Sequence, residues 1–188
     1  FLASLRHLHG PKQRIAAADE VVLVALVRDG AYYLDGFFDH YRRLGVAHFV
    51  FFDNGSREGT LDRLRQQPGV SILQSTLPWG DYENDFRSYA AKRYATDRWC
   101  LIADMDEIFD FEGRAEIGLR GLTGFLTDQG YTGLMAQMLE MFPKAPLSMV
   151  AALPYLQVLQ QFDHCDISSV TAYDYQSPAT GLGYFLHQ

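Results

Sequence analysis

The chain has 188 residues, 48% of them hydrophobic, which suits one domain with a substantial core or most of a larger one. Its formal net charge of −7 at pH 7 argues against a nucleic-acid-binding surface, and no apolar run approaches the roughly 20 residues that span a bilayer. The two cysteines, Cys100 and Cys165, suggest neither a disulfide framework nor a structural zinc site, so we expect a protein of the reducing cytoplasm.

The expected first strand covers residues 21–27, a continuous aliphatic run that follows a leader of mixed composition over residues 1–20. Within the leader, Gly10-Pro11 is typical of a break in regular structure. A polar turn follows the strand, and apolar residues then recur at helical spacing from Leu34 until Gly45 ends the helix. We therefore expect the first ordered element to begin at Val21 and to lead into a helix.

Further strands alternate with helices along the chain. Strands are expected over residues 47–52, 70–74 and 99–103, and helices over residues 61–64 and 86–94, the latter after a loop over residues 79–83. The run 99–103 has the apolar density of a strand that is buried on both faces. Such alternation is typical of βαβ units, so the predicted fold class is α/β with a mainly parallel sheet flanked by helices.

The chain after residue 110 offers fewer patterns. A helix interrupted by glycines is expected over residues 117–126, and another buried strand over residues 132–142. The methionines at positions 135, 138, 141 and 149 are interpreted as core residues that fill gaps. Trp99 is interpreted as a core residue as well.

Polar residues follow three of the expected strands, and each of these strand ends carries an aspartate: Asp29, Asp53 and Asp104. The carboxyl ends of parallel strands lie along one edge of a sheet, which is where open α/β sheets bind ligands. We therefore expect these three aspartates to gather in one cleft.

Asp104 and Asp106 are candidate metal ligands. In an extended chain, residues i and i+2 point the same way, so the two carboxylates can share one cation while Met105 turns to the other face. Oxygen ligands favour hard cations such as Mg²⁺ or Mn²⁺. The alternative is a strand that ends in a solvated acidic turn.

Two common phosphate-binding motifs are absent from the sequence. No Gly-x-Gly-x-x-Gly follows the first strand and no Gly-Lys-Ser/Thr loop occurs, which argues against a Rossmann dinucleotide site and a Walker-type site. Phosphates bound by this chain must be held in another way, and a bound metal can hold them.

Three motifs occupy the strand ends: VRDGAYYL at residues 27–34, FDNGS at residues 52–56 and WCLIADMDEIF at residues 99–109. In order and spacing they resemble the GT-A glycosyltransferases, specifically the family-2-like bacterial branch. The resemblance implies a nucleotide-sugar-binding GT-A core over residues 21–146 and an incomplete acceptor-side region over residues 147–188. It also implies an inverting hexosyltransferase that uses Mn²⁺ or Mg²⁺, a UDP- or GDP-sugar donor and an acceptor hydroxyl of a glycan or another molecule.

By this resemblance, Asp53 contacts the nucleoside, Asp104 the ribose or metal side, and Asp106 the metal that bridges the diphosphate. The resulting donor-binding set is Val27, Arg28, Asp29, Asp53, Asn54, Ser56, Arg87, Asp104 and Met105, with Asp104 and Asp106 as metal ligands. Arg87 is included because it could reach a diphosphate, with a solvated helix surface as the alternative. Relatives commonly read Asn-Glu after the first strand, and Arg28-Asp29 stands here, so donor preference stays open.

The general base is not assigned by these motifs. In inverting relatives it usually lies well downstream of the metal motif, and we expect this chain to be a fragment that lacks its C-terminal part. If the base lies within the chain, Asp163 and Asp166 are the first candidates, with a loop or helix cap as the alternative reading of their cluster.

Two other functions remain open. A phosphohydrolase of the haloacid dehalogenase type also carries Asp-x-Asp at a strand end with Mg²⁺, although there the motif normally follows the first strand and here three expected strands precede it. A non-catalytic nucleotide-sugar-binding module is the second alternative.

Overall fold

The computed structural model describes residues 1–13, 17 and 19–168. These residues fall into two compact units. The first comprises Phe1–Met135 with Pro154–Leu156, and the second comprises Ala136–Leu153 with the described residues from Gln157 onward. The division after Met135 lies before the boundary at residue 146 that the sequence predicted.

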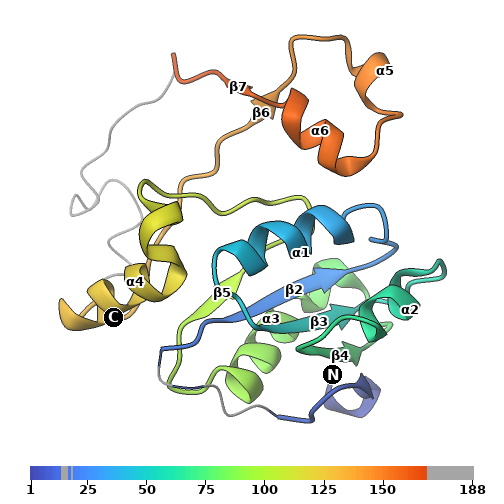
Figure 1. The fold of residues 1–188 in the computed structure, drawn as a ribbon. Coiled ribbons are helices and arrows are strands. Elements are labelled where there is room, and N and C mark those ends of the chain that lie inside the picture. Colours follow the sequence, from blue (N-terminus) through green and yellow to red (C-terminus); the bar gives the residue numbers. More distant parts are fainter. Residues whose placement is uncertain (14–16, 18, 169–188) are drawn as a thin grey trace. The chain divides into compact units, whose positions relative to one another are not determined.

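The first unit is built on a five-stranded sheet of order β1-β4-β3-β2-β5 (Figure 1). Its strands are β1 (Arg6–His9), β2 (Val22–Val27), β3 (His48–Asp53), β4 (Val70–Gln74) and β5 (Cys100–Ile102). Strands β2 to β5 pair in parallel, and β1 pairs antiparallel with β4. The prediction of an α/β fold with a mainly parallel sheet is therefore confirmed.

Strand β1 corrects the expectation that the first ordered element begins at Val21. Arg6 pairs with Gln74 and His7 with Leu73, so part of the supposed leader is an edge strand of the sheet. At Gly10 the backbone has φ +74°, and a Cβ added there would lie 2.2 Å from the carbonyl oxygen of Val70. Glycine at this position lets the chain leave the sheet against β4, and a short polar edge strand of this kind carries little hydrophobic signal. A single 3₁₀ turn, Leu2–Ser4, precedes β1.

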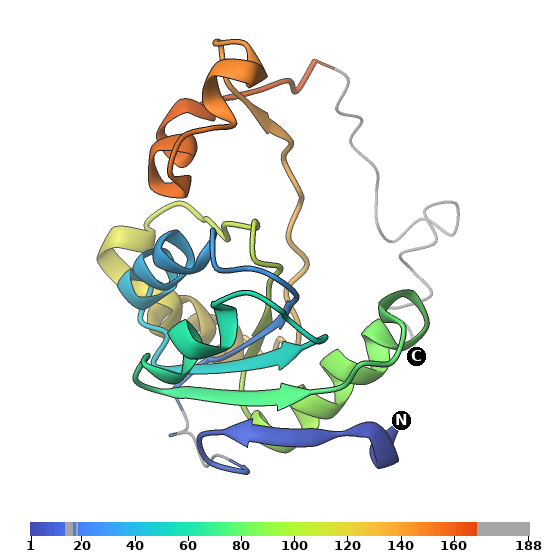
Figure 2. The same cartoon turned by 90° about the vertical axis from the view of Figure 1, so that its right-hand side faces the viewer.

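Helices cover both faces of the sheet. Helices α1 (Leu34–Arg43) and α2 (Thr60–Arg65) lie on one face, and α3 (Trp79–Tyr94) lies on the other (Figures 1 and 2). Side chains of β2 alternate between the two: Leu23 packs in the cluster with Phe37 of α1, and Val24 in the cluster with Phe86 of α3. Because both faces are covered, the strands read as continuous apolar runs rather than as alternating ones.

Helix α3 begins at Trp79, so the loop predicted over residues 79–83 is the first turn of a helix instead. Pro78 occupies the N-cap position with extended backbone, φ −55° and ψ 127°. The buried residues Phe86, Ala90 and Tyr94 recur every four residues on one face, and this spacing marks only the second half of the helix. The polar first turn carries no such signal.

Strand β5 is less buried than predicted. It has three residues, of which Cys100 and Leu101 are half-buried and Ile102 is 46% exposed. The expectation of a strand buried on both faces is wrong because β5 is the last strand of the sheet. Trp99, just before it, is only partly buried, and its indole N–H donates to Thr127 Oγ1.

Helix α4 (Arg114–Asp128) contains the predicted glycine interruption. Gly118 has φ +57° and ψ −175°, outside helical values. The next residue, Leu119, donates its amide to the carbonyl of Leu44 at 2.9 Å and buries its side chain in the core. The interruption thus lets the chain bond to the end of α1.

The buried strand predicted over residues 132–142 is wrong. Within it only β6 (Met141–Phe142) is a strand, and it pairs with β7 (His164–Cys165). Met135, Met138 and Met141 are 62%, 61% and 41% exposed, and Met149 is 69% exposed, so the methionines are not core residues. The division between the two units falls inside this run, and no described strand of the main sheet pairs with it.

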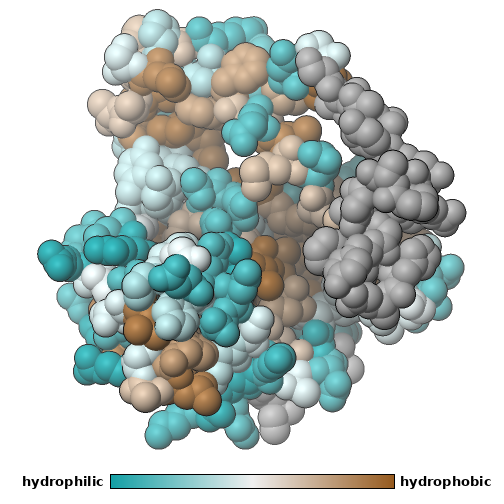
Figure 3. Space-filling view, turned by 180° about the vertical axis from the view of Figure 1, so that it is seen from behind, coloured by the Kyte–Doolittle hydropathy of each residue, from teal (hydrophilic) through white to brown (hydrophobic). Residues whose placement is uncertain are grey.

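The second unit also contains α5 (Leu147–Val150) and most of α6 (Tyr155–Gln161). In the space-filling view of Figure 3, hydrophobic side chains reach the surface among hydrophilic ones. None of the helices formed by described residues combines the length and the apolarity that crossing a membrane requires.

Candidate functional site

The strand order of the sheet changes direction at one point, between β2 and β5. From β2 the chain proceeds outward through β3 and β4, and then returns to the other side of β2 as β5. Ligands of open α/β sheets bind outside the carboxyl ends of the strands where the order reverses in this way. The candidate site therefore consists of the loops that follow β2 and β5, with the neighbouring loop after β3.

The loops after β2 and β3 are bonded to each other. The amide of Asp29 donates to Ser56 Oγ at 2.9 Å, and Asp29 Oδ1 accepts from the amide of Arg57 at 2.7 Å. The amide of Ala31 donates to Glu58 Oε1 at 2.7 Å. The structure thus brings the predicted residues Asp29 and Ser56 together, and the Asp29 carboxylate fixes backbone of the neighbouring loop.

Asp53 is fully buried, at 0% exposure, at the end of β3. Its Oδ2 accepts from the amide of Gly55 at 2.9 Å and from Gln74 Nε2 at 2.7 Å, and its Oδ1 accepts from the amide of Ser56 at 3.1 Å. These donors satisfy the carboxylate within the protein, so Asp53 shapes the turn rather than facing the cleft.

The side chain of Asn54 extends this support to the neighbouring strand. Its Nδ2 donates to the carbonyls of Ser75 and Leu77, each at 2.8 Å. Through these two bonds, the amide of Asn54 ties the turn after β3 to the chain between β4 and α3.

The predicted metal motif forms a β-turn. The amide of Glu107 donates to the carbonyl of Asp104 at 3.1 Å, and the amide of Asp104 donates to Glu107 Oε2 at 2.8 Å. We call residues Asp104–Glu107 the acidic turn. The expectation of an extended chain from Asp104 to Asp106 is wrong, because this turn closes after the strand.

Within the acidic turn, Met105 is buried and Asp106 is exposed. Met105 lies against the loop after β2, since a Cβ built on Gly30 would be 3.7 Å from Met105 Cγ. The two loops at the reversal point are thus in contact, and the Asp106 carboxylate is open to a ligand.

Arg87 of α3 pairs with Asp104. Its Nη2 donates to Asp104 Oδ1 at 2.8 Å, and its Nη1 forms an ion pair with Glu83 one helical turn earlier. Arg87 Nε is buried and has no hydrogen-bond partner among the described residues. The structure therefore joins two predicted site residues, Arg87 and Asp104, and adds Glu83, which its i, i+4 spacing to Arg87 could have revealed.

Helix α1 holds the chain after the acidic turn. Tyr41 Oη donates to the carbonyl of Glu107 at 3.0 Å and accepts from the amide of Phe109 at 3.2 Å. Burial raises the pKa of Tyr41 to about 12, so this phenol stays neutral. His40 Nε2 lies 2.8 Å from the carbonyl of Phe109 and must carry the proton, because a carbonyl can only accept. No pattern in the sequence predicts these contacts, since both residues occupy ordinary positions on a helix.

The remaining predicted donor residues lie at the end of β2. Val27 is buried in the sheet, and Arg28 after it is exposed. The guanidinium of Arg28 makes no hydrogen bond or ion pair with any residue that the structure describes.

The candidate general bases, Asp163 and Asp166, belong to the second unit. Asp163 forms an ion pair with His164, and Asp166 Oδ1 accepts from the amide of Ser168 at 2.9 Å. The hydrogen bond from His164 lowers the pKa of Asp163, and those from Ser168 lower the pKa of Asp166. A lowered pKa makes each carboxylate a weaker proton acceptor.

The donor chemistry of the acidic turn fits a hard cation in part. Among residues 1–13, 17 and 19–168, no three His, Cys, Asp or Glu side chains are placed to hold a metal ion together. Asp104 and Asp106 supply carboxylate oxygens, and Mg²⁺ commonly takes one or two carboxylates with substrate phosphates and water as the other ligands. A metal bound here would therefore take its other ligands from water or from a phosphate-bearing molecule.

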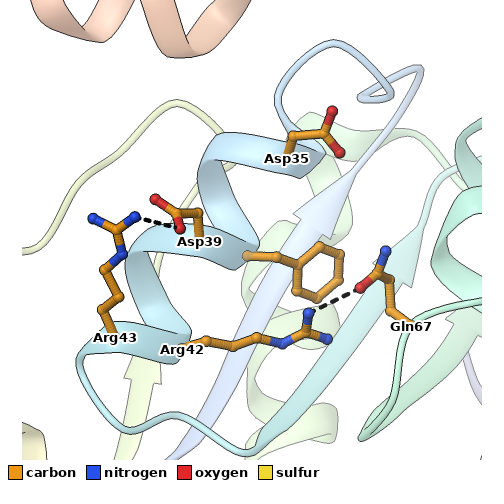
Figure 4. A pocket seen from close by; sticks show the side chains of 6 residues that line it. Asp35, Asp39, Arg42, Arg43 and Gln67 are labelled. Carbon is orange, nitrogen blue, oxygen red and sulfur yellow. Dashed lines mark hydrogen bonds and ion pairs between the residues drawn. The ribbon is translucent and has the colours of Figure 1, made fainter.

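A shallow depression of about 490 Å³ lies on the outer surface of α1 and is lined by Asp35, Phe38, Asp39, Arg42, Arg43 and Gln67 (Figure 4). None of the predicted site residues lines it. Arg43 pairs with Asp39 at 2.8 Å, and Arg42 donates to Gln67 at 3.0 Å. Asp35 pairs with Arg63, so each charged group that lines the depression has a partner within the protein. We therefore place the site at the acidic turn.

Comparisons of the sequence with protein families and with curated proteins, and of the fold with solved structures, find no match.

Proposed function

We propose that this chain binds a nucleoside-diphosphate sugar with Mn²⁺ or Mg²⁺ and transfers the sugar to an acceptor hydroxyl. The observation that carries the proposal is the acidic turn at the reversal point of the sheet, with Asp106 exposed beside the loop after β2. The resemblance of three strand-end motifs to GT-A glycosyltransferases supports it.

In this proposal the charged residues have separate tasks. Asp106 is the principal carboxylate for the cation, and Asp104 adds a second oxygen when Arg87 turns toward the phosphates. Arg28, exposed at the end of β2, is a second cation within reach of a phosphate. Asp53, Asn54 and Ser56 shape the turn beneath the nucleoside.

The reaction forms a bond from the acceptor oxygen to the anomeric carbon and breaks the bond from that carbon to the diphosphate. Negative charge develops on the leaving diphosphate, and a divalent cation would supply charge stabilisation there. Arg87 and Arg28 would add to this stabilisation. The proton of the acceptor hydroxyl passes to a general base that we do not assign.

Calorimetry with UDP and GDP, each with Mn²⁺ or with a chelator, tests the proposal. We expect at least one nucleotide to bind more tightly with metal, and Asp106→Asn to remove most of this difference. Asp110→Asn, an equal charge change just beyond the turn, should leave it unchanged. Equal affinity with and without metal in the wild type would contradict the proposed cation site.

Turnover assays separate the other functions. Transfer from a panel of UDP- and GDP-sugars would support glycosyl transfer, and metal-dependent nucleotide binding without transfer would favour a binding module or a fragment that lacks its base. A trapped phosphoaspartate at Asp104 would instead identify a phosphohydrolase of the haloacid dehalogenase type.

A further inference from the structure

Three tyrosine rings gather beside the acidic turn. Tyr32 and Tyr33 precede α1, and Tyr155 begins α6 but belongs to the first unit. The ring centroids lie 5.1 Å apart for Tyr32 and Tyr33, 4.9 Å for Tyr33 and Tyr155, and 5.5 Å for Tyr32 and Tyr155. We call these three residues the tyrosine cluster.

The cluster is bonded to the backbone of Asp106, the residue whose carboxylate we assign to the cation. Tyr155 Oη donates to the carbonyl of Asp106 at 3.4 Å. Burial first, and the negative charge of Asp106 second, raise the pKa of both Tyr33 and Tyr155. The phenols therefore remain neutral hydrogen-bond donors and acceptors within the field of that carboxylate.

Exposure is divided unequally among the three rings. Tyr155 is 7% exposed, Tyr33 is half-buried and Tyr32 is 46% exposed. The rings of Tyr33 and Tyr155 meet nearly edge to face at 79°, and Tyr32 packs against both. The more buried rings of Tyr33 and Tyr155 thus hold the exposed ring of Tyr32 in position. A ligand that stacks on Tyr32 therefore costs little conformational entropy of that side chain.

We propose that Tyr32 is a stacking surface for a pyranose ring beside Asp106, and this inference rests on the proposed glycosyl transfer. One face of a pyranose is lined with C–H groups that suit the face of an aromatic ring, while its hydroxyls need hydrogen-bonding partners such as phenols. Tyr32 offers a ring face and a phenol but no cationic group, so a neutral sugar fits this place better than a phosphate.

The test compares Tyr32→Ala and Tyr32→Phe with Tyr131→Ala. Tyr131 is a suitable control because it belongs to the same unit, is 58% exposed and makes no ring contact with the described residues. One arm measures the affinity of UDP and UDP-glucose, and of GDP and GDP-mannose, with Mn²⁺. The other arm follows tyrosine ring signals by NMR during titration with methyl glycosides of glucose, galactose, mannose and N-acetylglucosamine, without nucleotide.

We expect Tyr32→Ala to weaken sugar-dependent binding at least threefold in one arm, Tyr32→Phe to retain most of it, and Tyr131→Ala to change nothing. If Tyr32→Ala loses affinity for a nucleotide sugar, the pyranose that stacks on Tyr32 is the donor sugar. If it loses affinity for a methyl glycoside, that pyranose is the acceptor sugar. An equal loss for UDP and UDP-glucose would point to the nucleobase and overturn the inference. If Tyr32→Ala binds every probe like the wild type, or the wild type shows no sugar-dependent binding in either arm, the inference fails. Metal-dependent UDP binding would then still support the proposed function.

Discussion

Arg87 Nη2 and Asp104 Oδ1 lie 2.8 Å apart, so a guanidinium from the middle of α3 neutralises one carboxylate of the acidic turn. The same guanidinium pairs with Glu83, and its buried Nε has no partner in the part of the chain that the structure describes. One cation thus separates two carboxylates that would otherwise repel each other.

The first prediction concerns this cation. Arg87→Gln should tighten the binding of Mn²⁺ alone severalfold, because Glu83 and Asp104 lose the charge that competes with the metal. The same change should weaken nucleotide binding in the presence of Mn²⁺, because a phosphate partner is lost. Manganese titrations followed by electron paramagnetic resonance, with and without UDP, measure both effects.

Arg43→Gln is the control for Arg87→Gln, since Arg43 pairs with Asp39 on the exposed surface of α1. It should alter neither titration. A parallel fall of metal and nucleotide affinity in Arg87→Gln would show that Arg87 supports the fold of the turn and does not compete with the cation.

The second prediction is that Asp53→Asn acts on stability. One carboxylate oxygen becomes an amide N–H group that faces the donors of Gly55, Ser56 or Gln74, and a buried polar group without its partner costs about 1–3 kcal/mol. Urea unfolding should show a loss of this size. Asp85→Asn, at an exposed position of α3, should unfold like the wild type.

An unchanged free energy of unfolding in Asp53→Asn, together with weaker nucleotide binding, would contradict this reading. It would return Asp53 to the role that the motif resemblance implied, a contact to the nucleoside.

The third prediction is that Tyr41→Phe loosens the acidic turn. The phenol is fully buried and bonds to both Glu107 and Phe109, so its loss should lower stability by about 1–3 kcal/mol and weaken nucleotide binding with Mn²⁺. Tyr94→Phe is a matched control, because Tyr94 Oη bonds to Pro11 on the other side of the sheet. Tyr94→Phe should lower the free energy of unfolding and leave nucleotide binding with Mn²⁺ unchanged. Equal binding by both variants would show that Tyr41 does not position the turn.

The fourth prediction is a loss of stability in acid that depends on His40. Burial lowers the pKa of His40, and Arg114 acts in the same direction, while the bond to Phe109 and the charges of Asp110 and Asp39 oppose it. The unfolded chain therefore binds a proton more readily than the folded one. Stability should fall as pH drops from about 7 through the ordinary histidine pKa of about 6.5 toward the lowered value of the folded state.

Urea unfolding between pH 7.5 and 5 measures this dependence. In His40→Gln, whose amide can still donate to Phe109, the fall in stability over this range should be smaller than in the wild type. An identical pH dependence in the two proteins would exclude His40 as its source.

Much of the sheet could be predicted from the sequence, because runs such as residues 21–27 and 47–52 are covered on both faces and are therefore almost entirely apolar. Strand β1 escaped prediction because its pairing with β4 depends on residues more than sixty positions away. The prediction of a buried strand over residues 132–142 was wrong for a different reason. This run has the composition of a buried strand, but no described strand of the main sheet pairs with it.

At the candidate site, the sequence predicted some of the residues that lie together, but less well what each would do; no described contact joins Asp104 to Asp29 or Asp53. Asp29, Asp53 and Ser56 do lie together, since strand ends share one edge. Their hydrogen bonds, however, are made to backbone amides of neighbouring loops, and such bonds depend on turn geometry that spacing does not specify. The pairing of Asp104 with Arg87 is likewise set by how α3 lies against the sheet.

The bonds between the loops after β2 and β3 have a further consequence. Asp29, Ala31, Arg57 and Glu58 form hydrogen bonds with the opposite loop, and every donor and acceptor in these bonds belongs to the protein itself. The conformational entropy of these loops is therefore lost on folding, and little of it is left to lose on binding. A ligand that binds beside Asp106 contacts loops whose conformation is already fixed. Its binding free energy is therefore not reduced by the cost of ordering these loops.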